Sequence, residues 1–325
     1  MNGVARMSEN KIVLIKRKTR LEELVVRYNT IQQAQFYIER LGADFSDYIS
    51  EDLTYRKAVE TAVIELSAVG RVQLLERQHV PNFIFGDEDT VVVVGQDGLV
   101  ANTLKYLREQ PLIGVNPDPQ RWDGVLLPFT VKDLRLLLPD VFRGRREVRE
   151  VTLAKAELND GQSLYGVNDL FIGRKTHVSA RYLLQLSGTA EQQSSSGIIV
   201  STGMGSTGWL RSVLAGAAGI ARSAAGIGLA APEAAAGLAG ADARGRLAWD
   251  HPHLYFAVRE PFPSRTTSAG LVFGQIGSHQ PLRIISQMPE DGVIFSDGVE
   301  SDFLEFNSGV EAVISLAEKK GRLVV

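Results

Sequence analysis

The 325-residue chain contains no cysteine. This absence excludes disulfide bonds, thiolate metal sites and cysteine nucleophiles, and it fits a reducing compartment. The N-terminal stretch MNGVARMSENK also lacks the apolar run of a secretory signal peptide. From these two absences we predict a cytoplasmic location.

Histidine is scarce, because the chain has only five, and none lies at a spacing typical of a metal site. We therefore predict no metal site built from the chain's own residues.

The net charge of -3 and the lack of a basic and aromatic pattern give no reason to expect a nucleic-acid partner. The sequence also has no GxSxG segment that would indicate a serine hydrolase.

Only one stretch raises the question of a membrane span. Residues 213–246 are rich in alanine and glycine, but Arg222, Pro232 and Glu233 interrupt them. A membrane-spanning helix needs about 20 consecutive, predominantly apolar residues. The stretch therefore predicts a helical insertion with flexible joints, and no membrane partner is expected.

The first part of the chain alternates short apolar runs with segments of helical periodicity. The runs that predict strands are residues 11–15, 71–76, 91–94 and 112–116. Helices are expected from Leu21 and over residues 31–41 and 54–69, with Thr19 and Thr30 as N-caps of the first two. Such alternation indicates βαβ units and a parallel sheet. Residues 1–132 are predicted to form a doubly wound α/β domain.

The pattern changes after a turn-rich segment and a leucine-rich helix around residues 131–138. Beyond it, apolar residues mostly recur with a period of two, between tight turns. Residues 133–325 are therefore predicted to form a second, β-rich domain with a sandwich-like fold. We also expect the last residues to pack back on the first domain.

The most informative stretch is VVVVGQDGLVANTLKYL, residues 91–107. It predicts a buried strand, a glycine-flanked acidic loop at Gly95, Gln96, Asp97 and Gly98, and a helix. Glycines let backbone approach phosphates, and a helix start offers free N–H groups to anions. A carboxylate there can orient or deprotonate a hydroxyl that attacks a phosphoryl group. The alternative is an ordinary Asp-Gly turn.

A basic loop follows the first predicted strand. Lys18 and Arg20 lie between that strand and the helix that begins at Leu21. From charge and position we expect both side chains to face donor phosphates. The alternative is a solvated run of charge.

A second glycine loop follows the predicted strand at residues 198–201. Thr202, Ser206 and Thr207 place hydroxyls near a predicted helix start, where phosphate or ribose could be held. No lysine follows the glycine as in a P-loop, and the third glycine of the dinucleotide fingerprint is missing. The alternative is a cap-and-turn motif.

Farther on, Asp297-Gly298 is interpreted as a hairpin turn, with a substrate-facing element as the alternative.

Taken together, these motifs resemble those of the NAD kinases. In that family a GGDGT loop is followed by an IGVN-type strand, an Asn-Glu pair and a TPTGSTAY-like loop. The counterparts here, in the same order, are GQDGL (95–99), IGVN (113–116), Asn168-Asp169 and TGMGSTGW (202–209). The likeness is closer to the mitochondrial-type branch, which has further motifs similar to KTRLE at Lys18, GVNPDP at Gly114, NDLFIG at Asn168, SARYLL at Ser179, SSG at Ser195 and REP at Arg259.

The resemblance implies an α/β domain that carries the acidic loop and a β-rich domain that holds NAD, in a homodimer or higher homo-oligomer. It implies phosphoryl transfer from ATP, with Mg²⁺, to the adenosine 2′-hydroxyl of NAD. Asp97 matches the residue that activates this hydroxyl, and Gly95, Gln96 and Gly98 fall in the phosphate loop. The residues assigned to NAD are Asn116, Asn168, Asp169, Thr202, Ser206, Thr207 and Trp209.

Two substitutions in the first loop keep other functions open. Gln96 replaces the second glycine of GGDG, and Leu99 replaces the threonine. One alternative is therefore a catalytically impaired regulator that binds NAD or NADP. Another is a related kinase acting on a different alcohol, such as a lipid or a sugar. Polyphosphate is an alternative donor to ATP.

Overall fold

The computed structural model describes residues 10–225, 238–242, 244–299 and 302–325. The chain divides into two compact units, residues 1–149 together with 322–325 (unit 1) and residues 150–321 (unit 2). The boundary expected after residue 132 falls inside unit 1, because helix α6 (Leu134–Phe142) packs against helix α4 of that unit. The end of the chain, residues 322–325, is grouped with unit 1.

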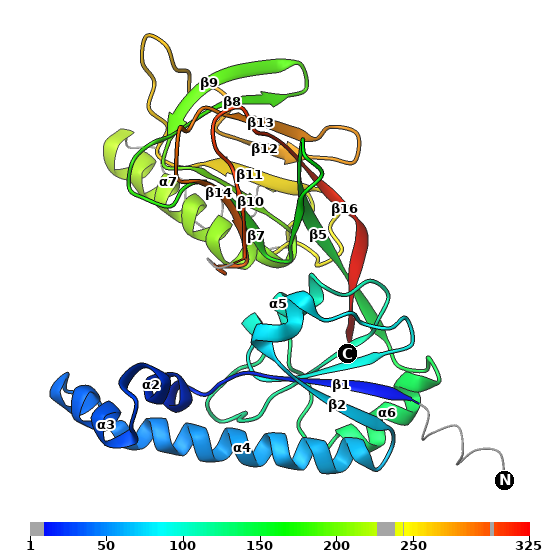
Figure 1. Cartoon of the computed structure of the whole chain (residues 1–325). Helices are drawn as coiled ribbons and strands as arrows, with labels where there is room; N and C mark the ends of the chain where they lie inside the picture. Colours follow the sequence, from blue (N-terminus) through cyan, green and yellow to red (C-terminus); the bar gives the residue numbers. More distant parts are fainter. Residues whose placement is uncertain (1–9, 226–237, 243, 300–301) are drawn as a thin grey trace. The chain divides into compact units, whose positions relative to one another are not determined.

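Unit 1 is built on a parallel sheet with helices on both faces (Figure 1). The strands run in the order β2-β1-β3-β4, and Leu323 at the end of β16 (Glu311–Val324) pairs in parallel with Leu112 of β4. The other elements of this unit are β1 (Lys11–Lys16), α2 (Arg20–Tyr28), α3 (Ile31–Arg40), α4 (Phe45–Ser67), β2 (Arg71–Glu76), the 3₁₀ helix η1 (Arg77–Asn82), β3 (Thr90–Val94), α5 (Asp97–Leu104) and β4 (Leu112–Val115). The doubly wound fold predicted for this part of the chain is confirmed.

The helix starts of unit 1 follow local hydrogen bonding. Thr19 caps α2 in a capping box with Glu22, and Thr30 caps α3 through the N–H of Gln33, both as predicted. Helix α4 begins at Phe45 rather than near residue 54, because Asp44 caps it by accepting a hydrogen bond from Ser46. The extra turns matter for the site, since they carry the acidic residues described below.

The core of unit 1 lies where α4 and α6 cover one face of the sheet. Alternate residues of the strands point toward these helices, as a period of two requires. The buried members include Ile12, Leu14, Val92, Val94, Ile113, Val115 and Val324 from the strands and Tyr55, Ala58, Ala62, Leu66, Leu134, Leu137 and Leu138 from the helices. Helix α5 lies on the other face (Figure 1). This packing fixes the carboxyl ends of β1 and β3, where the two predicted loops begin.

Unit 2 contains two sheets of mostly antiparallel strands. One has the order β16-β13-β8-β9, with β5 and β6 attached, and the other has the order β12-β11-β10-β7-β14-β15. Their strands are β5 (Val148–Leu158), β6 (Ser163–Gly166), β7 (Asp169–Arg174), β8 (Ala180–Leu186), β9 (Thr189–Ser195), β10 (Ile198–Ser201), β11 (Leu254–Val258), β12 (Phe273–Ile276), β13 (Leu282–Ser286), β14 (Gly292–Ser296) and β15 (Phe303–Glu305). The β-rich fold predicted for this part of the chain is confirmed.

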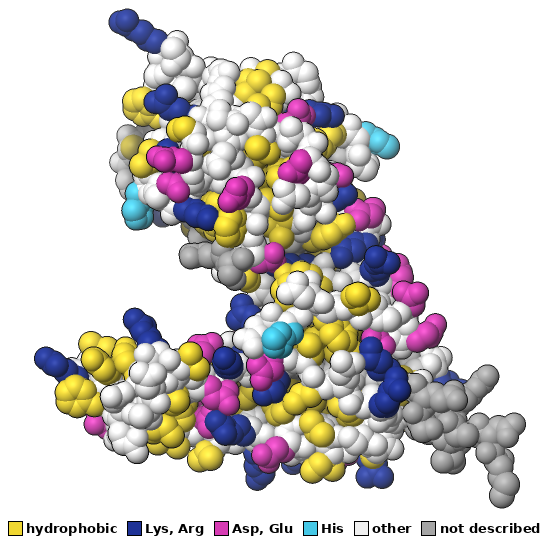
Figure 2. Space-filling view, viewed as in Figure 1, with side chains coloured by type: hydrophobic (Ala, Val, Ile, Leu, Met, Phe, Trp, Pro, Cys, Tyr) yellow, Lys and Arg dark blue, Asp and Glu magenta, His cyan; other side chains and the backbone are white. Residues whose placement is uncertain are grey.

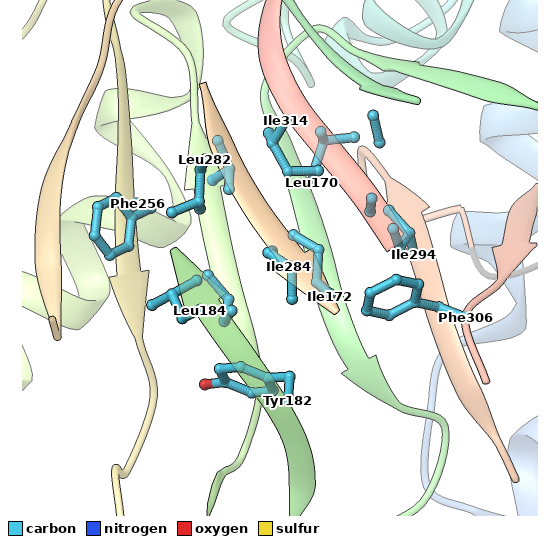
Figure 3. Packing of buried hydrophobic residues seen from close by; sticks show 14 of the residues in the cluster. Leu170, Ile172, Tyr182, Leu184, Phe256, Leu282, Ile284, Ile294, Phe306 and Ile314 are labelled. Carbon is cyan, nitrogen blue, oxygen red and sulfur yellow. The ribbon is translucent and has the colours of Figure 1, made fainter. Parts of the chain in front are cut away.

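The core of unit 2 is formed by the facing surfaces of the two sheets (Figure 3). Leu170, Ile172 and Ile294 come from one sheet, and Leu184 and Ile284 come from the other. Because strand side chains alternate, the neighbours Phe171 and Phe295 lie on the opposite face of the first of these sheets. That face, at the ends of β7, β10 and β14, carries the candidate site.

The second glycine loop forms the 3₁₀ helix η2 (Met204–Thr207) and leads into α7 (Trp209–Ala225). Buried Leu210 of α7 packs against Tyr255 and Ala257 of β11. The predicted insertion at residues 213–246 thus begins as a helix, and its residues 226–237 and 243 lie outside the described residues. Within the described part of the chain, no helix combines the length and apolarity that crossing a membrane requires.

Candidate functional site

Asp97 is the first residue of helix α5, directly after the strand β3 and the residues Gly95 and Gln96. It is therefore part of a strand–loop–helix junction, the order of elements that the sequence predicted, and not an isolated Asp-Gly turn. Its carboxylate accepts hydrogen bonds from the N–H groups of Leu126 at 2.8 Å and Val125 at 3.2 Å. These two contacts hold one side chain of the loop in a defined position while leaving it partly exposed.

The start of α5 presents free backbone donors. Gln96 is the N-cap but makes no side-chain capping hydrogen bond. In the described part of the chain, the N–H groups of Asp97 and Gly98 have no acceptor. A Cβ atom at Gly98 would have no neighbour within 4 Å. The loop therefore has open space and unpaired amides where an anionic group could approach.

Leu99, the residue that replaces threonine in the family motif, does not line this open space. It is buried in the core, and a Cβ atom at Gly95 would lie 2.8 Å from its Cδ2 atom. Its side chain thus packs beneath the loop. Leucine in place of threonine therefore changes the packing of the junction and not its exposed surface.

Of the two cations predicted in the basic loop, Arg20 is bound by helix α4, whereas Lys18 is exposed to solvent. Arg20 forms ion pairs with Asp47, at 2.8 Å, and with buried Glu51, and its guanidinium lies 4.4 Å from the ring centre of Tyr48. Hydrogen bonds from Arg121 and Arg20 hold the pKa of Asp47 well below its usual range. To contact a donor phosphate, as the sequence suggested, Arg20 would have to exchange these carboxylates for it. Lys18 is exposed and forms no ion pair within the described residues.

Asn116 has a buried side chain with a structural role. Its amide donates to the carbonyl of Trp122 at 2.8 Å, and its carbonyl accepts from the N–H of Asp118 at 3.0 Å. These bonds fold the turn after β4. Both the NH₂ group and the oxygen of the Asn116 side chain are therefore hydrogen-bonded within unit 1.

Unit 2 brings four of the predicted NAD-binding residues together around one cavity of about 340 Å³. Asn168 directly precedes β7 and Asp169 begins it, whereas Thr207 ends η2 and Trp209 begins α7. These two segments are distant in sequence but adjacent in space, because β7 and β10 pair in the sheet. The remaining walls are Met204, Gly205, Gly208, Asp297 and Gly298.

Asp297 is a site residue that the sequence interpretation placed in a plain turn. Its carboxylate accepts hydrogen bonds from the N–H groups of Asn168 at 2.6 Å and Val167 at 3.0 Å. Its backbone is left-handed, with φ of 54°. Asp297 therefore fixes the backbone of the Asn168-Asp169 pair from the end of β14. The Asp-Gly dipeptide can be seen in the sequence, but the backbone N–H groups that the Asp297 carboxylate binds lie more than one hundred residues earlier in the chain.

The Asp169 carboxyl faces an unfavourable environment for its charged form. Burial, together with the nearby charge of Asp297, raises the pKa of Asp169 to about 7. Between the ordinary pKa of 3.8 and this raised value, the folded protein binds the proton more tightly than the unfolded chain does. The contribution of the Asp169 carboxyl to the free energy of unfolding is therefore fully present below about pH 3.8 and is lost as the pH rises through about 7.

We expect Asp169→Asn to remove this pH dependence, because asparagine stays neutral. The variant should unfold at a higher temperature than wild type at pH 8, and the difference should disappear near pH 4. Thermal melting from pH 4 to pH 8 measures this. A melting temperature of the variant that exceeds that of wild type by the same amount at pH 4 and at pH 8 would contradict the raised pKa of Asp169.

Two other predicted residues direct their hydroxyl groups into the protein. Thr202 donates to the carbonyl of Val167 at 2.5 Å, and the hydroxyl of Ser206 accepts from the N–H of Leu247 at 3.2 Å. Both side chains are buried, and neither lines the cavity. They tie the glycine loop to its neighbours and thereby support the residues that do line it.

A larger cavity of about 540 Å³ shares Trp209 with the first. Phe171 stacks on Trp209, with ring centres 5.7 Å apart, and Phe295 lies against Phe171. The cationic members of the lining are Arg174, Lys175 and Arg259. Aromatic rings beside cations suit a ligand that combines planar rings with negative charge.

Elsewhere, charged side chains of both signs are interspersed over the visible face of each unit (Figure 2). Within the described residues, no group of three or more histidine, aspartate or glutamate side chains is placed to hold a metal ion. Asp97 is thus a single carboxylate and not part of an acidic cluster. A Mg²⁺ ion held mainly by phosphate oxygens and water would be compatible with such a site.

Comparison with known proteins relates this arrangement to one family, although no protein-family model matches the chain. The mitochondrial NAD kinase 2 of Rattus norvegicus is 24% identical, in an alignment that covers 80% of this chain and 75% of the relative. The human mitochondrial NAD kinase 2 is 25% identical over 62% of this chain and 57% of the relative.

Solved structures of similar fold include an NAD kinase from Archaeoglobus fulgidus in complex with ATP. It has a TM-score of 0.54 and 16% identity, and the match covers 97% of this chain and 93% of that one. Yeast NADH kinase complexed with NADH has a TM-score of 0.54 and 15% identity, covering 98% and 84%. The resemblance that the motifs indicated is confirmed, because the chain has the fold of the NAD kinases and is similar in sequence to their mitochondrial type.

Proposed function

We propose that this protein is an NAD kinase, which transfers the γ-phosphoryl group of ATP to the 2′-hydroxyl of NAD. The observation that carries the proposal is the cavity of unit 2, where Asn168, Asp169, Thr207 and Trp209 meet. All four lie on motifs that the family shares. The names of the relatives, and the ATP and NADH in the structures of similar fold, support the same function.

Asp97 is the residue that we propose for the chemistry. As the 2′-oxygen bonds to the γ-phosphorus, the bond from that phosphorus to the bridging oxygen breaks, and ADP leaves. The hydroxyl proton passes to the Asp97 carboxylate. The two backbone hydrogen bonds to this carboxylate hold it for that role, and a positioned base contributes typically 10²–10⁴-fold to such a step.

The unpaired amides at the start of α5 support phosphate binding by the same loop. The N–H groups of Asp97 and Gly98 and the open space at Gly98 would receive phosphate oxygens of ATP. Mg²⁺, held mainly by those phosphates, would neutralise charge that develops during transfer. Lys18, which is exposed and without an ion-pair partner in the described residues, would add a positive charge.

The cavities of unit 2 support binding of NAD. Asn168 and Asp169 offer hydrogen-bonding groups suited to ribose or base edges, and Trp209 offers a ring for stacking. Arg174, Lys175 and Arg259 of the larger cavity would complement the pyrophosphate charge. The buried position of Leu99 means that this substitution leaves the exposed surface of the junction unchanged, whereas Gln96, the other substitution, is partly exposed in the loop.

The proposal is tested by incubating purified protein with NAD, ATP and Mg²⁺ and measuring NADP with an NADP-specific dehydrogenase. Parallel reactions replace ATP by polyphosphate, or NAD by NADH, a sphingoid base, diacylglycerol or a sugar. We expect NADP to form with NAD. Tight binding of NAD without turnover would instead identify a binding protein, and phosphorylation of another alcohol alone would identify a different kinase. Light scattering on the same sample tests the proposed homodimer or higher homo-oligomer.

A further inference from the structure

Helix α4 contacts both loops that follow the central strands of unit 1, through one buried side chain. Tyr55 is 4% exposed and lies on the face of α4 that packs on the sheet. Its hydroxyl donates to the carbonyl oxygen of Val94 at 2.8 Å. The same hydroxyl accepts a hydrogen bond from the N–H of Arg17 at 2.9 Å. One oxygen atom therefore joins the end of β3 to the chain just after β1.

The Val94 carbonyl needs this partner. Val94 is the last residue of β3, immediately before Gly95, and it is fully buried. A buried carbonyl without a donor is strongly unfavourable, so the hydroxyl determines where this carbonyl can lie. Burial raises the pKa of Tyr55 to about 12, which keeps the hydroxyl protonated and able to donate throughout the neutral range.

The surrounding contacts restrict the Tyr55 ring as well. The guanidinium of Arg17 lies 5.1 Å from the ring centre, and it is held by Glu51 at 2.8 Å and by the carbonyl of Lys18 at 2.9 Å. Glu51 is 4% exposed and precedes Tyr55 by one helical turn. Ring and hydroxyl are thus fixed by α4, by the sheet and by the basic loop together.

We propose that Tyr55 is a positioning residue for phosphoryl transfer, because its hydroxyl sets the place of the Gly95–Gly98 loop, and hence of Asp97, relative to the basic loop. This inference rests on the proposed function. Asp97 follows Val94 by three residues, so a shift of the Val94 carbonyl would move the carboxylate from the position that its bonds to Val125 and Leu126 define. An error of about 1 Å in such a group can reduce a rate about 10²-fold.

The test compares Tyr55→Phe with wild type, with Asp97→Asn and with the double variant. We expect Tyr55→Phe to lower kcat about tenfold and to raise the KM for ATP, while the Kd for NAD stays within twofold. In the Asp97→Asn background the same change should lower kcat less than twofold, since Tyr55 acts through Asp97. Amide hydrogen exchange of a peptide covering residues 95–104 should be at least fivefold faster in Tyr55→Phe, with no change in peptides of unit 2.

Tyr28→Phe is the matched control, because the Tyr28 hydroxyl makes no hydrogen bond within the described residues. Wild-type kcat and exchange at residues 95–104 in Tyr55→Phe would overturn the proposal. A loss of kcat that a stabilising osmolyte restores would also overturn it, since the tyrosine would then serve stability alone. If wild type forms no NADP, the proposed function fails, and the exchange measurement still decides whether Tyr55 fixes the loop.

Discussion

Replacing Asp97 by asparagine should reduce the rate of NADP formation at least ~10²-fold. Asparagine has nearly the same shape, but it cannot take a proton from the attacking hydroxyl. One carboxylate oxygen accepts from Leu126 and the other from Val125, and an amide can replace only one of these acceptors. The initial rate with saturating NAD and ATP measures the loss.

The controls for Asp97→Asn separate chemistry from binding and from net charge. The Kd of NAD should stay within about threefold, because the residues proposed to bind NAD lie in unit 2. Asp123→Asn makes the same change of charge at an exposed position of unit 1 and should retain the wild-type rate. An Asp97→Asn variant that keeps more than half of the wild-type rate would exclude Asp97 as the base.

Replacing Gly205 by alanine should disrupt the cavity of unit 2. A Cβ atom at this position would lie 2.0 Å from the carbonyl oxygen of Asn168 and 2.9 Å from the Ser201 hydroxyl oxygen. The same carbonyl accepts a hydrogen bond from the N–H of Thr202 at 3.0 Å, so the loop cannot move away without losing it. Because backbone must shift, we expect a loss of about 3 kcal/mol in stability.

A loss of that size should lower the melting temperature by roughly 6–12 °C. The affinity for NAD should fall at least tenfold, since the displaced carbonyl belongs to a residue that lines the cavity. Gly216→Ala provides the matched control in helix α7, where an added Cβ atom meets nothing within 4 Å. That variant should be as stable as wild type or slightly more stable, because alanine is the better helix former. Equal melting temperatures for the two variants would contradict the crowding at Gly205.

Features governed by local sequence were predictable. Four β-branched residues followed by glycine predicted the strand β3 and its junction with α5, because a buried parallel strand and a helix start each have a local signature. Thr19 and Thr30 could be identified as caps, since a cap bonds within three residues of itself. The assignment of Asn168, Asp169, Thr207 and Trp209 to one ligand came from the family resemblance and not from local sequence.

Features set by distant partners were not predictable. The basic loop indicated phosphate binding, but the charges that hold Arg20 lie 27 and 31 residues later, on turns of α4 that lack clear apolar periodicity. Asp297 looked like part of a hairpin turn, because its role depends on β14 lying beside β7. The contacts of Tyr55 likewise join three elements. Pairing across elements leaves no period in the sequence, so only the fold reveals it.

The most direct test of the central claim is transfer of labelled phosphate from [γ-³²P]ATP to NAD, compared with 2′-deoxy-NAD, in the presence of Mg²⁺. The deoxy compound lacks the adenosine 2′-hydroxyl, and each compound is supplied at a concentration that saturates its separately measured binding. The account predicts that label appears in NADP at the 2′-position and that 2′-deoxy-NAD remains unlabelled. Equal labelling of both compounds, or label in neither while NAD is bound, would contradict it.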